Sequence, residues 1–270
     1  MAVSERLRHA IDMSGLYWAG EAEVARSYFH SDKRTRESDR LWLARQAFKE
    51  IWGSGFTAKD TSLIQGWAKQ LIEMFPKIDQ GVARHEALEL AEGLWAEFAH
   101  YCAFADAHDA MGRPGEPKLS PMAIRTITWP AEDRLSELRR AHRRDHGEIG
   151  WRATRFTEGG YCTLFAEAMK LADDAEGHDG RNGLIAKACA RVYDDEFGHM
   201  LMGIVEIDHE HMSDAEWALF ERLAEAQLKL RIQMRNEQFG FPLDDARVRA
   251  IYDGDVAPIA FDYERARLAA

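Results

Sequence analysis

The sequence predicts an all-α protein built around a bundle of four long helices that are joined by one long crossover. Apolar residues recur at intervals of three and four along most of the chain, which is the period of amphipathic helices. We find no run of alternating β-branched residues bounded by turns, the pattern of a strand. The segment 112–130 contains four prolines and divides the helical pattern into two halves.

Helical periodicity defines the individual elements. A shorter helix is expected over 16–30, and long helices near 36–53, 57–75, 82–111, 131–146, 149–175, 183–208 and 213–238. Short connections predict two hairpins, 57–75 with 82–111 and 149–175 with 183–208, and segment 112–130 is the crossover between them. The bundle core is then about 57–208, flanked by helices within 16–53, by helix 213–238 and by an irregular tail, all within a single domain of residues 1–270.

Two helix starts carry local signals. Ser213 and Glu216 have the spacing of a capping box at the start of helix 213–238. Pro130 suits the first position of the helix that follows the crossover.

Composition narrows the functional classes. The 270 residues include 35 Lys and Arg against 46 Asp and Glu, a net charge of −11, which disfavours binding to nucleic acid or anionic membranes. The three cysteines form no CxxC pair, and this argues against a disulfide framework or a zinc ribbon. The N-terminus is charged where a signal peptide is apolar, and no stretch reaches the length of a membrane span. We therefore expect a soluble, cytoplasmic protein.

Two Glu-x-x-His pairs stand out, Glu97 with His100 and Glu196 with His199. This spacing places a carboxylate and an imidazole one turn apart on one helix face, where both can bind one metal ion. Each glutamate interrupts an apolar stripe, and a buried carboxylate is costly unless it is paired or bound to metal. The stripes are Leu90, Gly93 or Leu94, Tyr101 and Phe104 around the first pair, and Ile185, Cys189, Val192, Met200, Gly203 and Ile207 around the second.

A third pair, Glu206 with His209, lies in the polar run EIDHEH at a helix end. Composition alone gives about one such pair by chance, and solvent can serve both side chains there. We interpret this pair as coincidental.

The hairpins predict two further acids at the same levels. Counting residues from each turn places Glu158 opposite Glu196, and Asp60 opposite Glu97. Alternatives remain open for both acids. Asp60 could instead close a capping box with Thr57, with Glu50 of the preceding helix as the substitute ligand. Glu158 could be a salt-bridge partner of Arg152 or Arg155, and Glu167 is a rival that lies nearer the turn.

Glu97-x-x-His100 followed by Asp195-Glu196-x-x-His199 resembles the di-iron carboxylate proteins of the ferritin-like superfamily. These include ribonucleotide reductase small subunits, soluble bacterial di-iron monooxygenases, acyl-carrier-protein desaturases and rubrerythrins. The resemblance covers roughly residues 57–208 and implies a ferritin-like bundle. It implies metal ligation by Glu97, His100, Glu196 and His199, with Glu158 as the third-helix carboxylate and Asp60 in the first-helix position, where no local motif defines the ligand.

Other residues near these ligands are candidates for catalytic roles. Asp195 would accept the free ring N–H of a ligating histidine and so fix its orientation. Tyr101, Tyr161 and Tyr193 each lie one turn from a proposed ligand and could form a radical or donate a hydrogen bond. The basic segment 134–155 is interpreted either as a solvated face or as a dock for an anionic substrate or an acidic partner.

Carboxylate-rich ligation with two imidazoles and no thiolate suits iron or manganese better than structural zinc. We therefore expect two iron ions, or a manganese–iron pair, and an oxygenase or oxidase that uses O₂ as co-substrate and acts on a small organic molecule. A separate protein would donate electrons, because the chain has no flavin or iron–sulfur motif. The resemblance also implies a homodimer. The rival hypotheses are a ferritin- or rubrerythrin-like protein that handles iron or reduces peroxide, and a metal-free helical interaction protein.

Overall fold

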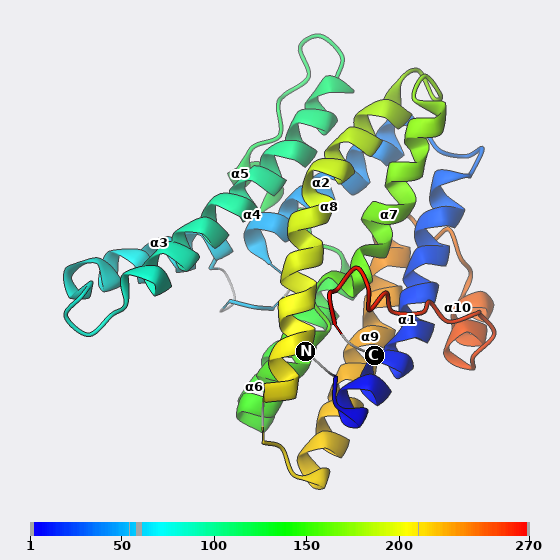
Figure 1. The fold of residues 1–270 in the computed structure, drawn as a ribbon. Helices are drawn as coiled ribbons and strands as arrows, with labels where there is room; N and C mark the ends of the chain where they lie inside the picture. Colours follow the sequence, from blue (N-terminus) through cyan, green and yellow to red (C-terminus); the bar gives the residue numbers. More distant parts are fainter. Residues whose placement is uncertain (1–2, 54, 58–60, 210, 269–270) are drawn as a thin grey trace.

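The helices follow one another along the chain (Figure 1). The computed structural model describes residues 3–53, 55–57, 61–209 and 211–268. Within these ranges every regular element is helical. The α-helices are α1 (Glu5–Phe29), α2 (Arg36–Trp52), α3 (Leu63–Met74), α4 (Arg84–Ala110), α5 (Pro121–Ile124), α6 (Pro130–Phe156), α7 (Thr163–Met169), α8 (Arg181–Val205), α9 (Asp214–Gln238) and α10 (Asp245–Tyr252).

The helices pack around a shared aromatic core. α4 packs against α2 and α8, α8 also contacts α6 and α7, and α9 covers α1 and α6. The largest fully buried aromatic side chains come from several of these helices and from the crossover: Trp18, Trp42, Phe104, Trp129 and Phe220. Burial of such aromatic surface is the main source of stability in a fold of this kind.

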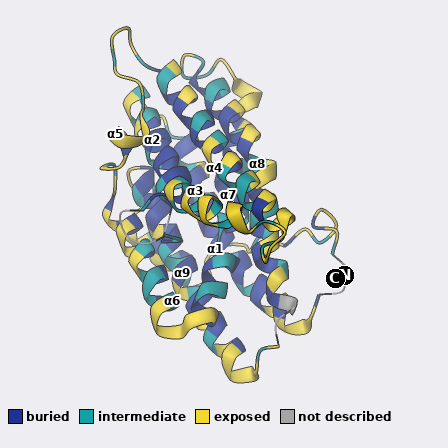
Figure 2. Ribbon diagram, turned by 90° about the vertical axis from the view of Figure 1, so that its left-hand side faces the viewer, coloured by how far each residue is buried: buried dark blue, intermediate teal, exposed yellow. Residues whose placement is uncertain are grey.

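The first predicted hairpin forms, but its position differs from the prediction. α3 packs against the N-terminal half of α4, and the two project from the rest of the protein (Figures 1 and 2). Leu63 is the only buried residue of α3, and Ile72 is 74% exposed. α2, predicted to flank the bundle, packs along α4 instead and takes the place assigned to helix 57–75.

The second half of the bundle also differs in part from the prediction. The break predicted near 147 is confirmed: Gly147 is non-helical (φ 54°, ψ −124°), and the part of α6 after it folds back on the part before it, so that Arg139 donates a hydrogen bond of 3.3 Å to Thr157. The helix predicted over 149–175 is instead interrupted by four residues, 159–162, whose φ values lie between 54° and 70°. Such a left-handed turn favours glycine, and Gly159 and Gly160 provide two of the four residues.

Several local predictions are confirmed. Ser213 and Glu216 form the capping box of α9, and Pro130 is the first residue of α6. The segment predicted as 16–30 is part of a longer helix that begins at Glu5. After α10 the tail is irregular, and its Ile259 donates a backbone hydrogen bond to the carbonyl of Gly15. Among the described helices, none combines the length and the apolar character needed to cross a lipid bilayer.

Candidate metal centre

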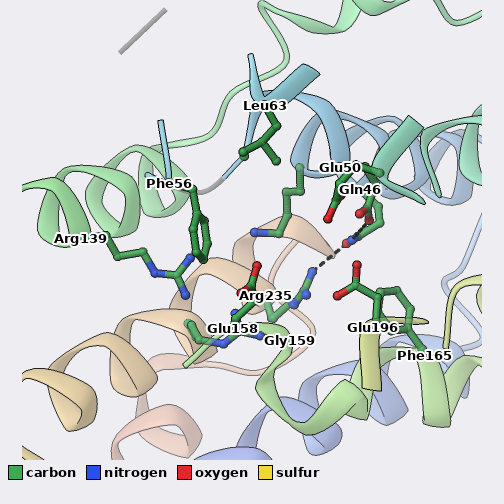
Figure 3. Close-up of a pocket in the computed structure, with 14 residues that line it drawn as sticks. Gln46, Glu50, Phe56, Leu63, Arg139, Glu158, Gly159, Phe165, Glu196 and Arg235 are labelled. Carbon is green, nitrogen blue, oxygen red and sulfur yellow. Dashed lines mark hydrogen bonds between the residues drawn. The ribbon is translucent and has the colours of Figure 1, made fainter. Parts of the chain in front are cut away.

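Four side chains from three helices converge inside the protein. They are Glu50 of α2, Glu97 and His100 of α4, and Glu196 of α8, and one donor atom from each lies within 4.8 Å of the others. All four residues are buried, none more than 8% exposed. Glu50 and Glu196 point into one cavity (Figure 3). Three carboxylates gathered away from water repel one another and require a positive counterpart.

The imidazole of His100 lies between this cluster and Asp195. Its Nδ1 is 3.2 Å from Glu196, 3.8 Å from Glu50 and 4.0 Å from Glu97, yet it is buried and makes no hydrogen bond of acceptable geometry. Its Nε2 is 3.4 Å from Oδ2 of Asp195. A neutral ring that donates Nε2–H to Asp195 directs the lone pair of Nδ1 at the three carboxylates, as a metal ligand must.

His199 and Glu158 extend the cluster. Nδ1 of His199 lies 3.9 Å from Oε1 of Glu97, and the two imidazole rings are 6.3 Å apart. Glu158 lines the same cavity as Glu50, Glu97 and Glu196. It also accepts a hydrogen bond of 3.2 Å from Arg155, so the salt bridge considered from the sequence forms as well. The structure thus groups one acid from α2, one Glu-x-x-His pair from each of α4 and α8, and the acid that follows α6.

Burial and mutual repulsion favour the protonated form of two acids in this cluster, Glu50 and Glu97. Burial and the charge of Glu196 raise the pKa of Glu50 to about 7, and burial, Glu196 and Glu50 raise the pKa of Glu97 well above its ordinary value. Burial lowers the pKa of His100, but the carboxylates of Glu196 and Glu50 outweigh it and raise that pKa to about 9. For Glu196, burial raises the pKa and His100 lowers it, with a net decrease. A metal ion that binds here would displace these protons.

The left-handed turn determines where Glu158 points. α6 ends at Phe156, and the backbone of Glu158 is extended, with φ −63° and ψ 145°. The turn at 159–162 then carries the chain into α7. The backbone conformation of Tyr161 and Cys162 costs about 1–2 kcal/mol per residue, strain of the sort that concentrates at functional sites.

Part of the cavity wall is basic. Its four cationic side chains are Lys49, Arg139, Arg231 and Arg235, and Arg235 projects toward the space between Glu158 and Glu196 (Figure 3). The space open to the centres of water molecules is about 70 Å³. Within the basic segment 134–155, Arg139 is buried and lines this wall, whereas Arg134 and Arg144 are exposed.

Sequence reasoning did not identify Arg231 and Arg235. A usable signal exists on α9, where Gln227, Arg231 and Arg235 recur every four residues beside the buried Leu228 and Ile232. Polar side chains on a buried helix face are uncommon without a partner or a function.

The first-helix ligand is the main revision. Asp60 lies outside the described residues, and the acid that joins the cluster is Glu50, the substitute candidate. Leu63, the first residue of α3, lines the cavity. Thr57 does not cap α3, because the N-cap is Ser62, which forms a capping box with Gln65.

The rival acids lie elsewhere. Glu167 forms ion pairs of 2.9 Å with Arg26 and with Lys170. The side chain of Glu206 is 60% exposed and lies 3.5 Å from Arg155. Two cations therefore neutralise Glu167, whereas solvent and Arg155 serve Glu206.

The hydroxyls of the three candidate tyrosines bond to other parts of the chain. Tyr101 donates to the carbonyl of Leu119 at 3.1 Å. Tyr161 accepts from the backbone N–H of Asp262 at 2.8 Å, and Tyr193 accepts from Arg265. These contacts involve the crossover and the C-terminal tail, and a catalytic role for Tyr101 or Tyr193 stays a prediction.

Comparison of the chain with models of protein families, with curated proteins and with solved structures finds no match. The arguments about function below therefore rest on the geometry of the site.

Proposed function

We propose that the protein is an O₂-dependent oxidase or oxygenase with a dinuclear iron centre in a ferritin-like bundle. The ligands proposed for the two ions are Glu50, Glu97, His100, Glu158, Glu196 and His199. The observation that carries the proposal is the buried Nδ1 of His100, which lacks a hydrogen bond although three carboxylates surround it. A metal ion between these groups would bind the lone pair and neutralise the acids.

The donor set fits iron or a manganese–iron pair. Four carboxylates and two imidazoles, with no thiolate among them, match the preferences of these ions. Two Glu-x-x-His pairs and two single glutamates are also the ligand set that four-helix carboxylate proteins use for two metals. Two iron ions held there would supply the oxidising chemistry with O₂.

The protein's own residues prepare the site. Asp195 fixes the ring of His100, and Gln46 donates a hydrogen bond to Oε1 of Glu50 and orients that carboxylate. Phe56, Leu63 and Phe165 form the apolar part of the cavity wall and limit the access of water. The substrate is a small organic molecule, and a separate protein supplies the electrons.

Metal analysis tests the proposal directly. The protein, made metal-free and reconstituted anaerobically with ferrous iron, should bind about two irons per chain, as expected for a two-metal site. Addition of O₂ should produce a transient visible absorption. Continued uptake of iron into a mineral would instead indicate storage, and metal at background level would refute the proposal. Anomalous scattering at the iron and manganese edges would identify each ion.

Matched variants test the ligand assignment. Glu196→Ala should abolish iron binding, whereas Glu206→Ala, in the equivalent position of the third Glu-x-x-His pair, should leave it unchanged. Glu50→Ala should reduce iron binding more than Asp60→Ala does. Equal losses within either pair would show that the wrong acid has been assigned.

A further inference from the structure

The irregular C-terminal tail after α10, residues 253–268, is closely fitted to the rest of the protein. It runs from α10 past α1 to the side of α8 (Figure 1). Where it passes α1, Ile259 donates its backbone N–H to the carbonyl of Gly15 at 3.0 Å. A Cβ atom at Gly15 would lie 2.5 Å from the carbonyl oxygen of Ile259, so this close approach requires a residue without a side chain.

One group of contacts joins the tail to the left-handed turn at 159–162. The backbone N–H of Asp262 donates a hydrogen bond of 2.8 Å to the hydroxyl of Tyr161. The ring of Tyr161 is stacked on Trp18 with a centroid distance of 4.6 Å, and its centroid lies 5.5 Å from that of Phe261 in the tail. Because Phe261 is only 7% exposed, it completes the aromatic packing around Tyr161.

A second group of contacts joins the tail to α8. Arg265 donates hydrogen bonds to the hydroxyl of Tyr193 and, at 3.3 Å, to the carboxylate of Asp194. Its guanidinium carbon lies 3.9 Å from the ring centroid of Phe197 and 4.5 Å from that of Tyr193. Phe197 directly follows the proposed ligand Glu196. The tail therefore connects the turn to the ligand-bearing part of α8.

The turn itself packs on α8 beside the proposed ligands. A Cβ atom at Gly159 would lie 3.1 Å from Cβ of Met200 and 3.7 Å from the carbonyl oxygen of Glu196. Glu158 directly precedes the turn, so the direction of its side chain depends on how the turn sits on α8. The turn contains two non-glycine residues with left-handed φ values, and such a conformation persists only where the surrounding contacts enforce it.

These contacts bear on the more exposed half of the proposed centre. The side chains of Glu158 and His199 are 21% and 24% exposed, whereas those of the other four proposed ligands are 11% exposed or less. Glu158 also accepts a hydrogen bond of 3.2 Å from Arg155. If the turn relaxed, this ion pair would compete with a metal ion for the carboxylate.

We infer that the C-terminal tail is a clamp that holds Glu158 in place for the metal position beside His199. Phe261 and Arg265 are its positioning residues: they act through the left-handed turn and through α8 and are not themselves ligands. This inference rests on the proposed function and gives the tail a part in the same site. It predicts that loss of the clamp weakens one metal position and leaves the position beside His100 unchanged.

Manganese(II) binding by tail variants of the full chain tests the inference. Wild-type protein should bind about two ions, with the electron paramagnetic resonance spectrum of a coupled pair. Phe261→Ala and Arg265→Gln should each lower the affinity of one position by about tenfold or more, the loss expected when a group that orients a ligand is removed. After dialysis against a weak chelator, about one ion per chain should remain, with the spectrum of a single ion.

A matched control lies in the same tail. Arg267 is exposed and two residues beyond Arg265, so Arg267→Gln makes the same chemical change away from the contacts with Tyr193 and Phe197. It should retain two ions and the coupled spectrum. Arg265→Gln changes an exposed side chain, so it keeps the test decisive if Phe261→Ala does not fold.

The outcomes separate this inference from the proposed function. Wild-type protein that binds fewer than two ions overturns both. Wild-type protein with two ions and Arg265→Gln protein with the same two affinities overturn this inference alone. Equal weakening of both positions in Arg265→Gln also overturns it, because the tail would then only stabilise the bundle. An equal loss in Arg267→Gln overturns the assignment of the clamp to Arg265.

Discussion

The two Glu-x-x-His pairs have the same spacing but different surroundings. The side chain of His100 is 2% exposed and that of His199 is 24% exposed. His100 faces Glu50, Glu97, Glu196 and Asp195, whereas Nδ1 of His199 lies 3.9 Å from Oε1 of Glu97. One half of the proposed centre is therefore assembled within the protein core, and the other half lies nearer to solvent.

The same Glu-x-x-His spacing can therefore provide two metal positions that differ in burial. A ligand that neighbouring groups hold in place loses little freedom when a metal binds, and a more mobile ligand loses more. We expect the position beside His100 to bind its metal more tightly than the position beside His199.

The largest effect is expected from His100→Ala. It removes the imidazole that would bind the metal directly, so metal affinity should fall by more than the ~10–100-fold seen when an outer partner of a ligand is lost. Competition with a chelator measures the change. His108→Ala is the control, because His108 lies on the same helix and is also buried but contacts Asp109. A loss of the same size in both variants would contradict the comparison.

His199→Ala should have a smaller and more selective effect. One metal per chain should remain, and the affinity for the other should fall by about 10–100-fold, since the loss is confined to the more exposed position. Metal analysis after dialysis against a weak chelator distinguishes the two positions. If His199→Ala removes both metals as completely as His100→Ala, the two halves are equivalent and the comparison fails.

The metal-free protein should lose stability as the pH rises. The pKa of Glu50 is raised from 4.5 to about 7, so its contribution to stability is complete below about pH 4.5 and is lost as the pH rises through 7. The pKa of His100 is raised from 6.5 to about 9, so its contribution is complete below 6.5 and is lost as the pH rises through 9.

Both contributions decrease as the pH rises. The free energy of unfolding, measured by urea denaturation between pH 5 and pH 9, reports their combined loss. Protein loaded with manganese(II) should show a smaller decline, because the bound ions replace the protons. If the free energy of unfolding of the metal-free protein instead rises between pH 5 and pH 9, the pKa values of Glu50 and His100 are not raised as assigned.

The smallest effect is expected from Tyr101→Phe. The change removes one hydrogen bond, from the hydroxyl to the carbonyl of Leu119, and should cost about 1 kcal/mol of stability. Metal content should remain at the wild-type level, as thermal unfolding and metal analysis on the same sample would show. Loss of metal in this variant would mean that Tyr101 acts on the centre from outside the cluster.

Much of the site could be predicted from the sequence because helical spacing is a local property. Glu97 with His100, and Glu196 with His199, follow from the period of the helix, and an acid within an apolar stripe marks burial. The predicted proximity of Asp195 to a ring nitrogen of a histidine also agrees with the structure, which places it beside His100.

The sequence pattern did not predict which helix packs against α4 near Glu97, because tertiary packing decides this. The count from the hairpin turn assumed that helix 57–75 follows α4 over its whole length. In the structure α3 begins only at Leu63. The helix that packs against α4 near Glu97 is therefore α2, and its acid is Glu50. Similarly, helical periodicity continued through 149–175, although Gly159 and Gly160 were visible as a pair that favours a break.

The left-handed turn after Glu158 joins the acidic and the basic walls of the cavity. A Cβ atom at Gly160 would lie 2.3 Å from Nη2 of Arg231 and 2.5 Å from Oε1 of Glu21. Gly160 therefore has two functions: its φ of 55° directs the chain away from α6, and its lack of a side chain leaves room for the Arg231–Glu21 pair. A single methyl group at this position would disturb the direction of Glu158 and the anchoring of Arg231 together, so one substitution would change both walls at once.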